Sequence, residues 1–168
     1  MDAPPLTNRP KRDSDFCPEC SALRVDGMTC WEQLGAILAW EWQDPELMAQ
    51  HFLTVASYNL QHPAQFTAAA LAGLQQQFIE HLDNGLPVAA VRRRISHLAA
   101  GHGKVLKPEA ERRPILRRWP MTIANVYIPN QPEGAAVRVK AWAARIREEL
   151  RNEMTPTATR IKCHLEAH

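Results

Sequence analysis

The sequence predicts an all-α protein, a single-domain bundle of about five helices that follows a short cysteine-containing loop. Three observations support this fold class. Apolar residues recur at three- and four-residue spacing through most of the chain after Trp31. Capping residues, prolines and glycines divide that part at intervals of helix length. A Cys-x2-Cys pair, Cys17 and Cys20, precedes the first periodic segment.

The length of 168 residues and the 45% share of hydrophobic residues suit one domain with its own core. We expect a flexible arm at 1–15, a helical domain at 16–154 and a flexible tail at 155–168. No apolar run approaches the roughly 18 residues of a membrane helix, and the N-terminus lacks the apolar segment of a secretory signal. A cytoplasmic protein with reduced thiols and no membrane contact is therefore expected.

The first helix is expected to begin in the segment 29–32, TCWE, which has the pattern of a capping box. It runs to about Trp42. Asp44 and Pro45 end it and begin the second helix, with Asp44 as the N-cap and Pro45 in the first turn.

The second helix is predicted to run without interruption from Pro45 to about His62, because the residue before Pro63 disfavours helical geometry. Its side chains are apolar nearly all round. We therefore expect it to be the central and most buried helix of the bundle.

The third helix is predicted at Thr67–Leu82, with Asn84 and Gly85 as its C-terminal cap, and the fourth at Pro87–Ala100. A long irregular connection follows at 101–131, a segment rich in proline and glycine. Its apolar residues require part of it to pack, either as helical turns or as short strands. The last helix is predicted at Pro132–Met154, and its core stripe consists of Val139, Trp142, Ala143, Ile146 and Leu150.

The cysteines suggest a metal site. Structural zinc takes four Cys or His ligands, and a Cys-x2-Cys loop supplies two of them from one turn. Cys30 lies at the start of a helix, where the helix dipole favours the thiolate form. An antiparallel return after the short turn at Asp44 would bring His62 beside Cys30. The predicted site is a zinc-knuckle loop that binds Zn2+ through Cys17, Cys20, Cys30 and His62. The alternative is three buried or redox-active thiols, with His62 as a helix cap.

His51 lies 11 residues before His62, about 16 Å along a continuous helix, so the two cannot share one metal ion. His62 is the preferred fourth ligand and His51 the alternative. His51 is otherwise either a buried histidine paired with Glu41 of the facing helix, or a general base or ligand in an additional polar site with Tyr58. Three residues of the tail offer a weaker metal site: Cys163, His164 and His168.

Five segments resemble an uncharacterised bacterial family of unknown function: CPEC at 17–20, Cys30, HFLTVASYNLQHP at 51–63, WPMT at 119–122 and AWA at 141–143. The family pattern is CPxCG, a downstream Cys, HxLTVxxYxLQHP, WPxT and a Trp-Ala helix, and it spans about 16–150. Ser21 stands where the family has Gly, which weakens the knuckle turn. The resemblance implies that the Cys and His residues of these segments matter, together with Tyr58, and it implies no reaction.

Charge is unevenly distributed, although the net charge is only +2. Residues 31–91 contain no Lys or Arg, whereas 92–118 contain nine basic residues and two acidic ones. The basic segment either lies across the acidic surface of the same molecule, is solvated, or binds nucleic acid. Nucleic acid is not favoured, because residues 92–94 spread over about 200° of a helix.

The function favoured by these patterns is a binding or adaptor module with a structural zinc ion and an unknown protein partner, because four protein ligands leave no open position for a substrate. One alternative is a metal-dependent, hydrolase-like enzyme that uses His51 or Tyr58 near the metal ion. A second alternative is a nucleic-acid binder that uses the segment 92–118.

Overall fold

The computed structural model of the chain describes residues 15–101 and 103–154. In these ranges it contains seven α-helices, five of them with seven or more residues, and no strand. The helices are α1 (Cys30–Glu41), α2 (Pro45–Met48), α3 (His51–Leu60), α4 (Ala68–Asn84), α5 (Val88–Ala100), α6 (Ile123–Val126) and α7 (Ala135–Met154). Two short 3-10 helices are η1 (Pro63–Gln65) and η2 (Glu109–Glu111).

This architecture confirms the all-α prediction with five helices of ordinary length. The predicted arm, apart from Asp15, and the predicted tail lie outside the described residues. None of the described helices combines the length and the apolar character that crossing a membrane requires.

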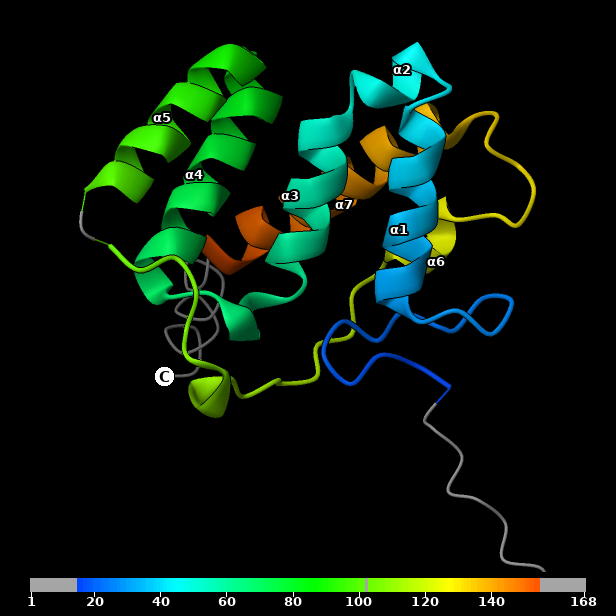
Figure 1. Cartoon of the computed structure of the whole chain (residues 1–168), viewed down its shortest axis with the longest axis horizontal. Coiled ribbons are helices and arrows are strands. Elements are labelled where there is room, and N and C mark those ends of the chain that lie inside the picture. Colours follow the sequence, from blue (N-terminus) through cyan, green and yellow to red (C-terminus); the bar gives the residue numbers. More distant parts are fainter. Residues whose placement is uncertain (1–14, 102, 155–168) are drawn as a thin grey trace, which may run out of the picture.

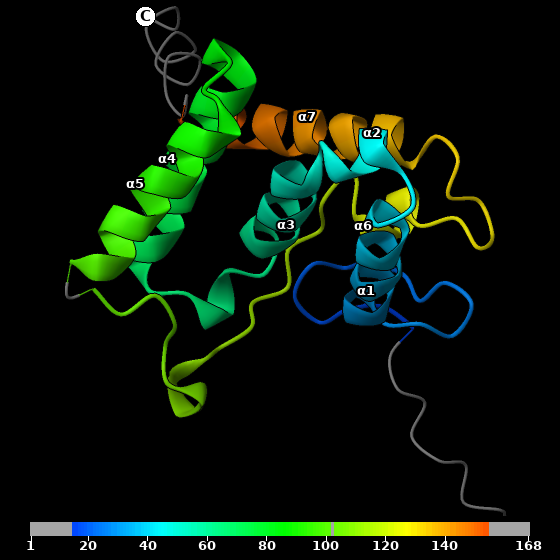
Figure 2. The ribbon, with the colours of Figure 1, turned by 45° about the horizontal axis from the view of Figure 1, so that its top comes forward.

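α3 lies in the middle of the molecule, as Figures 1 and 2 show. The α4–α5 pair stands on one side of it, and α1, α6 and the N-terminal loop stand on the other. α7 crosses behind and contacts α3, α6, α2 and α4. The core lies where these helices meet. Its fully buried large side chains include Ile37, Leu47, Phe78, Ile123, Trp142 and Ile146.

The predicted helix caps are present. The Thr29 hydroxyl accepts from the Glu32 backbone N–H, and the Glu32 carboxylate accepts from the Thr29 backbone N–H at 2.7 Å. Asp44 caps α2 by accepting from two backbone N–H groups. α4 ends at Gly85, which has a left-handed φ of 66°. These local signals fix where the helices begin and end.

The prediction of one continuous helix from Pro45 to His62 is wrong. α2 ends at Met48, and Gln50 has the non-helical angles φ −95° and ψ 6° before α3 begins. The break lets α2 pack its fully buried Leu47 near α1 and α7, while α3 turns to pack against α7 and α4.

The connection between α5 and α7 packs in part. α6 begins with a second capping box, formed by Thr122 and Asn125. Trp119, Val126 and Tyr127 of this segment are buried against the core, whereas Ile115 is 80% exposed. The segment is thus buried against the core from about Trp119 onwards, and it returns the chain to α7.

Candidate metal centre

The N-terminal loop folds back on itself and places two thiols together. The backbone N–H of Ser21 donates to the Cys17 carbonyl at 3.0 Å, and the Cys17 N–H donates to the Ala22 carbonyl at 2.8 Å. Phe16 and Leu23 form an isolated antiparallel bridge around this turn. Cys17 and Cys20 therefore project from a single closed turn.

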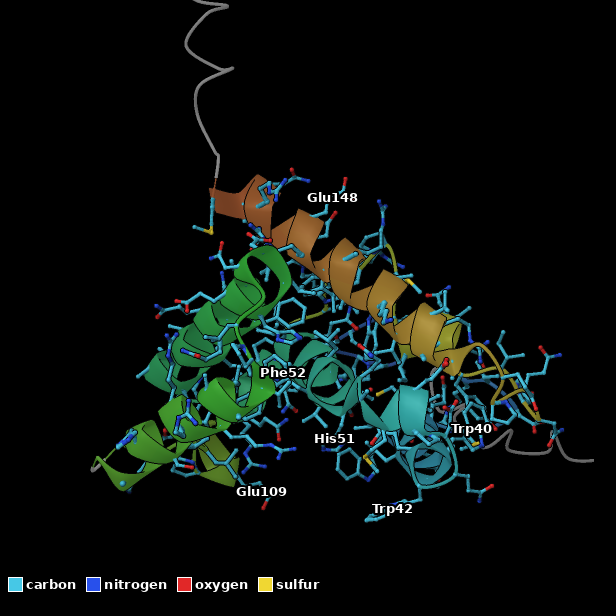
Figure 3. All side chains as sticks on the ribbon, turned by 90° about the horizontal axis from the view of Figure 1, so that it is seen from above. Trp40, Trp42, His51, Phe52, Glu109 and Glu148 are labelled. Carbon is cyan, nitrogen blue, oxygen red and sulfur yellow. The ribbon has the colours of Figure 1, made fainter. Side chains whose placement is uncertain are left out.

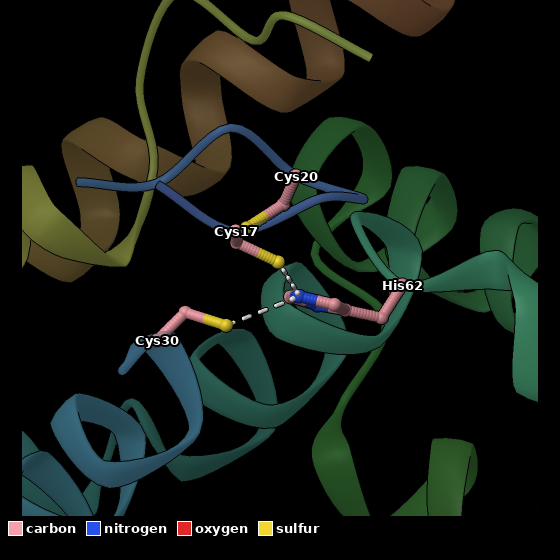
Figure 4. Close-up of side chains that lie close together, drawn as sticks. All are labelled: Cys17, Cys20, Cys30 and His62. Atoms are coloured by element: carbon pink, nitrogen blue, oxygen red, sulfur yellow. Dashed lines mark hydrogen bonds between the residues drawn. The ribbon is translucent and has the colours of Figure 1, made fainter. Parts of the chain in front are cut away.

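Two helix ends supply the other two residues of the cluster. Cys30 is the first residue of α1, and His62 follows directly after the C-cap of α3. α1 and α3 run in opposite directions, so the start of one lies beside the end of the other (Figure 1). One ligand atom from each of Cys17, Cys20, Cys30 and His62 lies within 4.8 Å of the other three (Figure 4).

The separations within the cluster fit a tetrahedral zinc ion. His62 Nε2 lies 3.5 Å from Cys30 Sγ and 3.7 Å from Cys17 Sγ. Zn–S bonds of about 2.3 Å and Zn–N bonds of about 2.0 to 2.1 Å, at a tetrahedral angle, place sulfur and nitrogen about 3.6 Å apart. These two separations match a tetrahedral site, and the cluster could hold a metal ion.

The neighbours of the cluster orient its donor atoms. His62 Nδ1 lies 2.7 Å from the Tyr58 carbonyl oxygen, so the Nδ1–H donates there and Nε2 faces the thiols. The Tyr58 ring stacks on the imidazole at 4.0 Å, and its hydroxyl lies 3.7 Å from Cys30 Sγ. The backbone N–H of Glu19 donates to Cys17 Sγ at 3.5 Å. Such contacts fix the histidine tautomer and support thiolates.

The protonation of the cluster is shared among its members. Hydrogen bonds with Cys20 and Cys30 hold the pKa of Cys17 well below its usual range, and the hydrogen bond with Cys17 raises the pKa of Cys20. Burial acts to lower the pKa of His62, but hydrogen bonds with Cys17 and Cys30 outweigh burial and raise it to about 10. Burial raises the pKa of Tyr58, which therefore stays a neutral donor. The site thus favours a thiolate at Cys17 and a protonated His62. A bound metal cation would displace the proton of His62.

A family model described as a family of unknown function, DUF5946, matches residues 15–151. The chain belongs to this family. No curated protein and no solved structure matches the chain. The family match confirms the resemblance found from the sequence and includes all four residues of the cluster. Ligation of a metal ion by these residues stays a prediction.

Ser21, at the position where the family pattern has glycine, adopts a left-handed φ of 61°. This conformation suits glycine and strains other residues. The chain therefore has a less suitable residue at this position of its turn. The second turn of the loop uses Gly27 at φ 75°, which suits its conformation.

His51 lies away from the cluster, at the opposite end of α3 from His62 (Figure 3 shows His51). Its Nδ1 lies 2.6 Å from Glu41 Oε2, so the expected pairing with Glu41 is present. The Glu41 side chain is 2% exposed and the His51 side chain 47%, so the expected burial of His51 is wrong. His51 is therefore not among the clustered side chains, and the four members are those preferred from the sequence.

A cavity of about 210 Å³ adjoins the cluster, and its lining includes Tyr58, His62, Trp31 and Arg112. His51 does not line it, so His51 and Tyr58 do not share this cavity. Sequence reasoning missed Trp31 and Arg112 as neighbours of the site, because neither stands at a spacing that indicates a ligand. It also missed Glu19, whose carboxylate accepts from the Ala64 N–H at 2.8 Å.

Two arginines of the basic segment 92–118 form ion pairs with acidic groups of the same molecule. Arg94 pairs with Glu80 of α4. Arg117 pairs with Glu149 at 3.7 Å and Glu153 at 2.5 Å, both on α7. These contacts match the interpretation in which the segment lies across the protein's own acidic surface.

Proposed function

We propose that Cys17, Cys20, Cys30 and His62 bind one zinc ion, that this ion is structural, and that the protein is a non-catalytic binding module. The observation that supports the site most strongly is the pair of Sγ–Nε2 separations, 3.5 and 3.7 Å. They lie on either side of the separation of about 3.6 Å that a tetrahedral zinc ion requires.

The donor set supports zinc over other metals. Soft thiolate ligands favour zinc, copper(I) or iron–sulfur chemistry, and imidazole combined with thiolates in a tetrahedral arrangement is typical of zinc. Hard ions such as Mg²⁺ and Ca²⁺ take oxygen ligands, and no oxygen ligand belongs to the described cluster.

A structural role is supported by the closed and buried ligand set. Four protein ligands complete the tetrahedral shell, whereas catalytic zinc sites keep one position for water or substrate. Cys20, Cys30 and His62 are buried, and only Cys17 is intermediate. The zinc ion would join the N-terminal loop, the start of α1 and the end of α3.

A protein partner is the occupant we propose for the surface beside the site. Trp31 is 67% exposed although its ring packs against Tyr58 at a centroid distance of 5.9 Å. Exposed aromatic side chains held in a fixed position are enriched at protein interfaces. The zinc ion would then hold this tryptophan in position through α1 and Tyr58.

The second candidate function is that of a metal-dependent enzyme, and the cavity beside Tyr58 and His62 is the observation that favours it. Arg112 on its wall would bind an anionic group of a substrate. Catalysis would need one ligand, such as Cys30, to leave the metal ion and open a position for water.

Metal content and thiol reactivity of the purified protein test these proposals together. We expect one zinc ion per chain, with Cys17, Cys20 and Cys30 protected from a thiol reagent until a chelator is added. One zinc ion with one reactive cluster thiol would favour the enzyme. Purified protein that contains no zinc and does not take it up would contradict both proposals.

Matched variants locate the site. Cys20→Ser and His62→Ala are expected to lower zinc content to a small fraction of the wild-type value. Cys163→Ser, which changes a cysteine outside the described residues, and His51→Ala, which changes the histidine paired with Glu41, are expected to keep it. Loss of zinc in either control would place the ligand set elsewhere.

A further inference from the structure

A second cavity, of about 230 Å³, lies on the side of α3 that faces α4. Phe52, Val55 and Asn59 line it from one face of α3, at the spacing of successive helical turns. Leu74 lines it from α4. Figure 3 labels Phe52 on this side of α3, toward the α4–α5 pair. No member of the Cys–His cluster lines this cavity.

Small residues open the space where α3 and α4 meet. Ala56 of α3 and both Ala70 and Gly73 of α4 line the cavity. Larger apolar side chains at these positions would fill it, as they fill the core between α3 and α7. The cavity therefore results from the small residues that α3 and α4 present to each other.

The connection after α5 is fastened over this cavity. The Val105 carbonyl accepts from the Thr67 N–H at 2.9 Å, and the Lys104 carbonyl accepts from the Thr67 hydroxyl at 2.8 Å. The Lys107 N–H donates to the Gln65 carbonyl at 2.9 Å. These bonds hold Val105 against the start of α4, where it lines the cavity together with Ile95 of α5.

The lining specifies the chemistry of an occupant. It includes no charged side chain, and its one polar side chain is the amide of Asn59. Hydrogen bonds within the described part of the chain involve the Asn59 backbone carbonyl and leave its amide side chain unpaired. The NH2 group of the amide can donate a hydrogen bond and its oxygen can accept one. The amide therefore matches a neutral hydroxyl, carbonyl or amide group of a ligand.

We propose that this cavity binds a small neutral apolar molecule, a ring system or a short alkyl chain, with one polar group directed at Asn59. The volume suits this class, since an apolar cavity of about 150 Å³ accepts benzene. A charged ligand is disfavoured, because the lining has no group to compensate a buried charge. The proposal does not depend on the zinc site.

Three probes that share a benzene ring test the proposal on the purified protein: toluene, benzyl alcohol and benzoate. Binding is followed by two-dimensional amide NMR. Benzyl alcohol and toluene are expected to saturate a single site and to shift the amide signals of α3, α4 and the 104–107 segment. Benzyl alcohol is expected to bind several-fold more tightly than toluene, and benzoate at least tenfold more weakly than benzyl alcohol.

Two variants and one control locate the binding. Ala70→Phe fills the cavity and is expected to weaken the binding of toluene and of benzyl alcohol at least tenfold. Ala72→Phe makes the same change at an exposed position of α4 that does not line the cavity, and it is expected to leave binding unchanged. Asn59→Leu is expected to remove the preference for benzyl alcohol over toluene while toluene still binds.

Four results would overturn the proposal: no saturable binding of either neutral probe, shifts confined to other helices, equal weakening by Ala70→Phe and Ala72→Phe, or an undiminished preference for benzyl alcohol in Asn59→Leu. The proposal would also be overturned if the protein self-associates, Ala70→Phe abolishes the self-association and the probes do not compete with it. A second copy of the chain would then be the occupant of the cavity. Should Ala70→Phe fail to fold, the Asn59→Leu comparison decides alone.

Discussion

At the scale of single residues, the neighbours Gln61 and His62 have separate roles. His62 belongs to the Cys–His cluster. Gln61, which is 1% exposed, donates to the Met121 carbonyl at 2.8 Å and accepts from the Trp142 indole N–H at 3.2 Å. Gln61 thereby links the end of α3 both to the segment before α6 and to α7. Neighbouring residues thus serve the proposed site and the core.

Gln61→Leu is expected to lower the free energy of unfolding by about 2 to 4 kcal/mol, because it leaves the Met121 carbonyl and the Trp142 N–H buried without partners. Chemical denaturation measures the change. Gln43→Leu, at an exposed position, serves as the control and is expected to change the free energy by less than about 0.5 kcal/mol. Equal effects of the two variants would show that Gln61 is not buried as described.

Ser21→Gly is expected to raise stability slightly, by about 0.5 kcal/mol, because relief of the left-handed strain exceeds the entropic cost of glycine in the unfolded chain. Ser96→Gly makes the same change inside α5 and is expected to lower stability by a similar amount. Thermal unfolding of both variants gives the two signs. A destabilising Ser21→Gly would mean that the turn does not hold residue 21 in the left-handed region.

Among the elements, the α4–α7 contact depends on charge as well as on packing. Arg147 of α7 donates to both carboxylate oxygens of Asp83 in α4, with Nε 2.9 Å from Oδ1. This hydrogen bonding lowers the pKa of Asp83 below its ordinary value. The pair joins the end of α4 to the second half of α7, and these helices are distant in the sequence. It is therefore a feature of helix arrangement.

The Asp83–Arg147 pair is expected to stabilise the protein by less than about 1 kcal/mol, in a pH-dependent way. A carboxylate whose pKa is lowered by folding contributes stability above its unfolded pKa of about 3.9 and loses it as pH falls through the lower folded value. Asp83→Asn is therefore expected to be less stable than the wild type at neutral pH and about equally stable in acid. In an Arg147→Gln background the same substitution is expected to show little of this pH-dependent difference, and a full difference there would contradict the pairing.

At the scale of the whole molecule, the proposed zinc ion would stabilise mainly the side that contains the N-terminal loop and α1. The N-terminal loop and α1 meet α3 at the cluster, whereas α4 and α5 pair with each other on the far side (Figure 2). A bound ion stabilises the folded state relative to the unfolded state, which has no preformed site. Its removal therefore affects the two sides differently.

Chelation is expected to increase amide hydrogen exchange in residues 16–41 much more than in α4, because the ion would join the loop to α1 and α3. Exchange measured by mass spectrometry with and without a chelator tests this. Acidification is expected to act in the same direction, since protons compete with the metal for thiolates and imidazole. Unchanged exchange after removal of a bound zinc ion would show that the ion is not structural.

The all-α class, most of the helix limits and the four residues of the cluster follow from the sequence. Caps such as Thr29 and Asp44 and the stop at Gly85 act through neighbouring backbone groups, so a short window of sequence specifies them. Tertiary structure alone decided the break before His51, the cavity facing α4 and the burial of Gln61. These depend on which distant helix each side chain meets, and packing between such segments outweighs local helix preference.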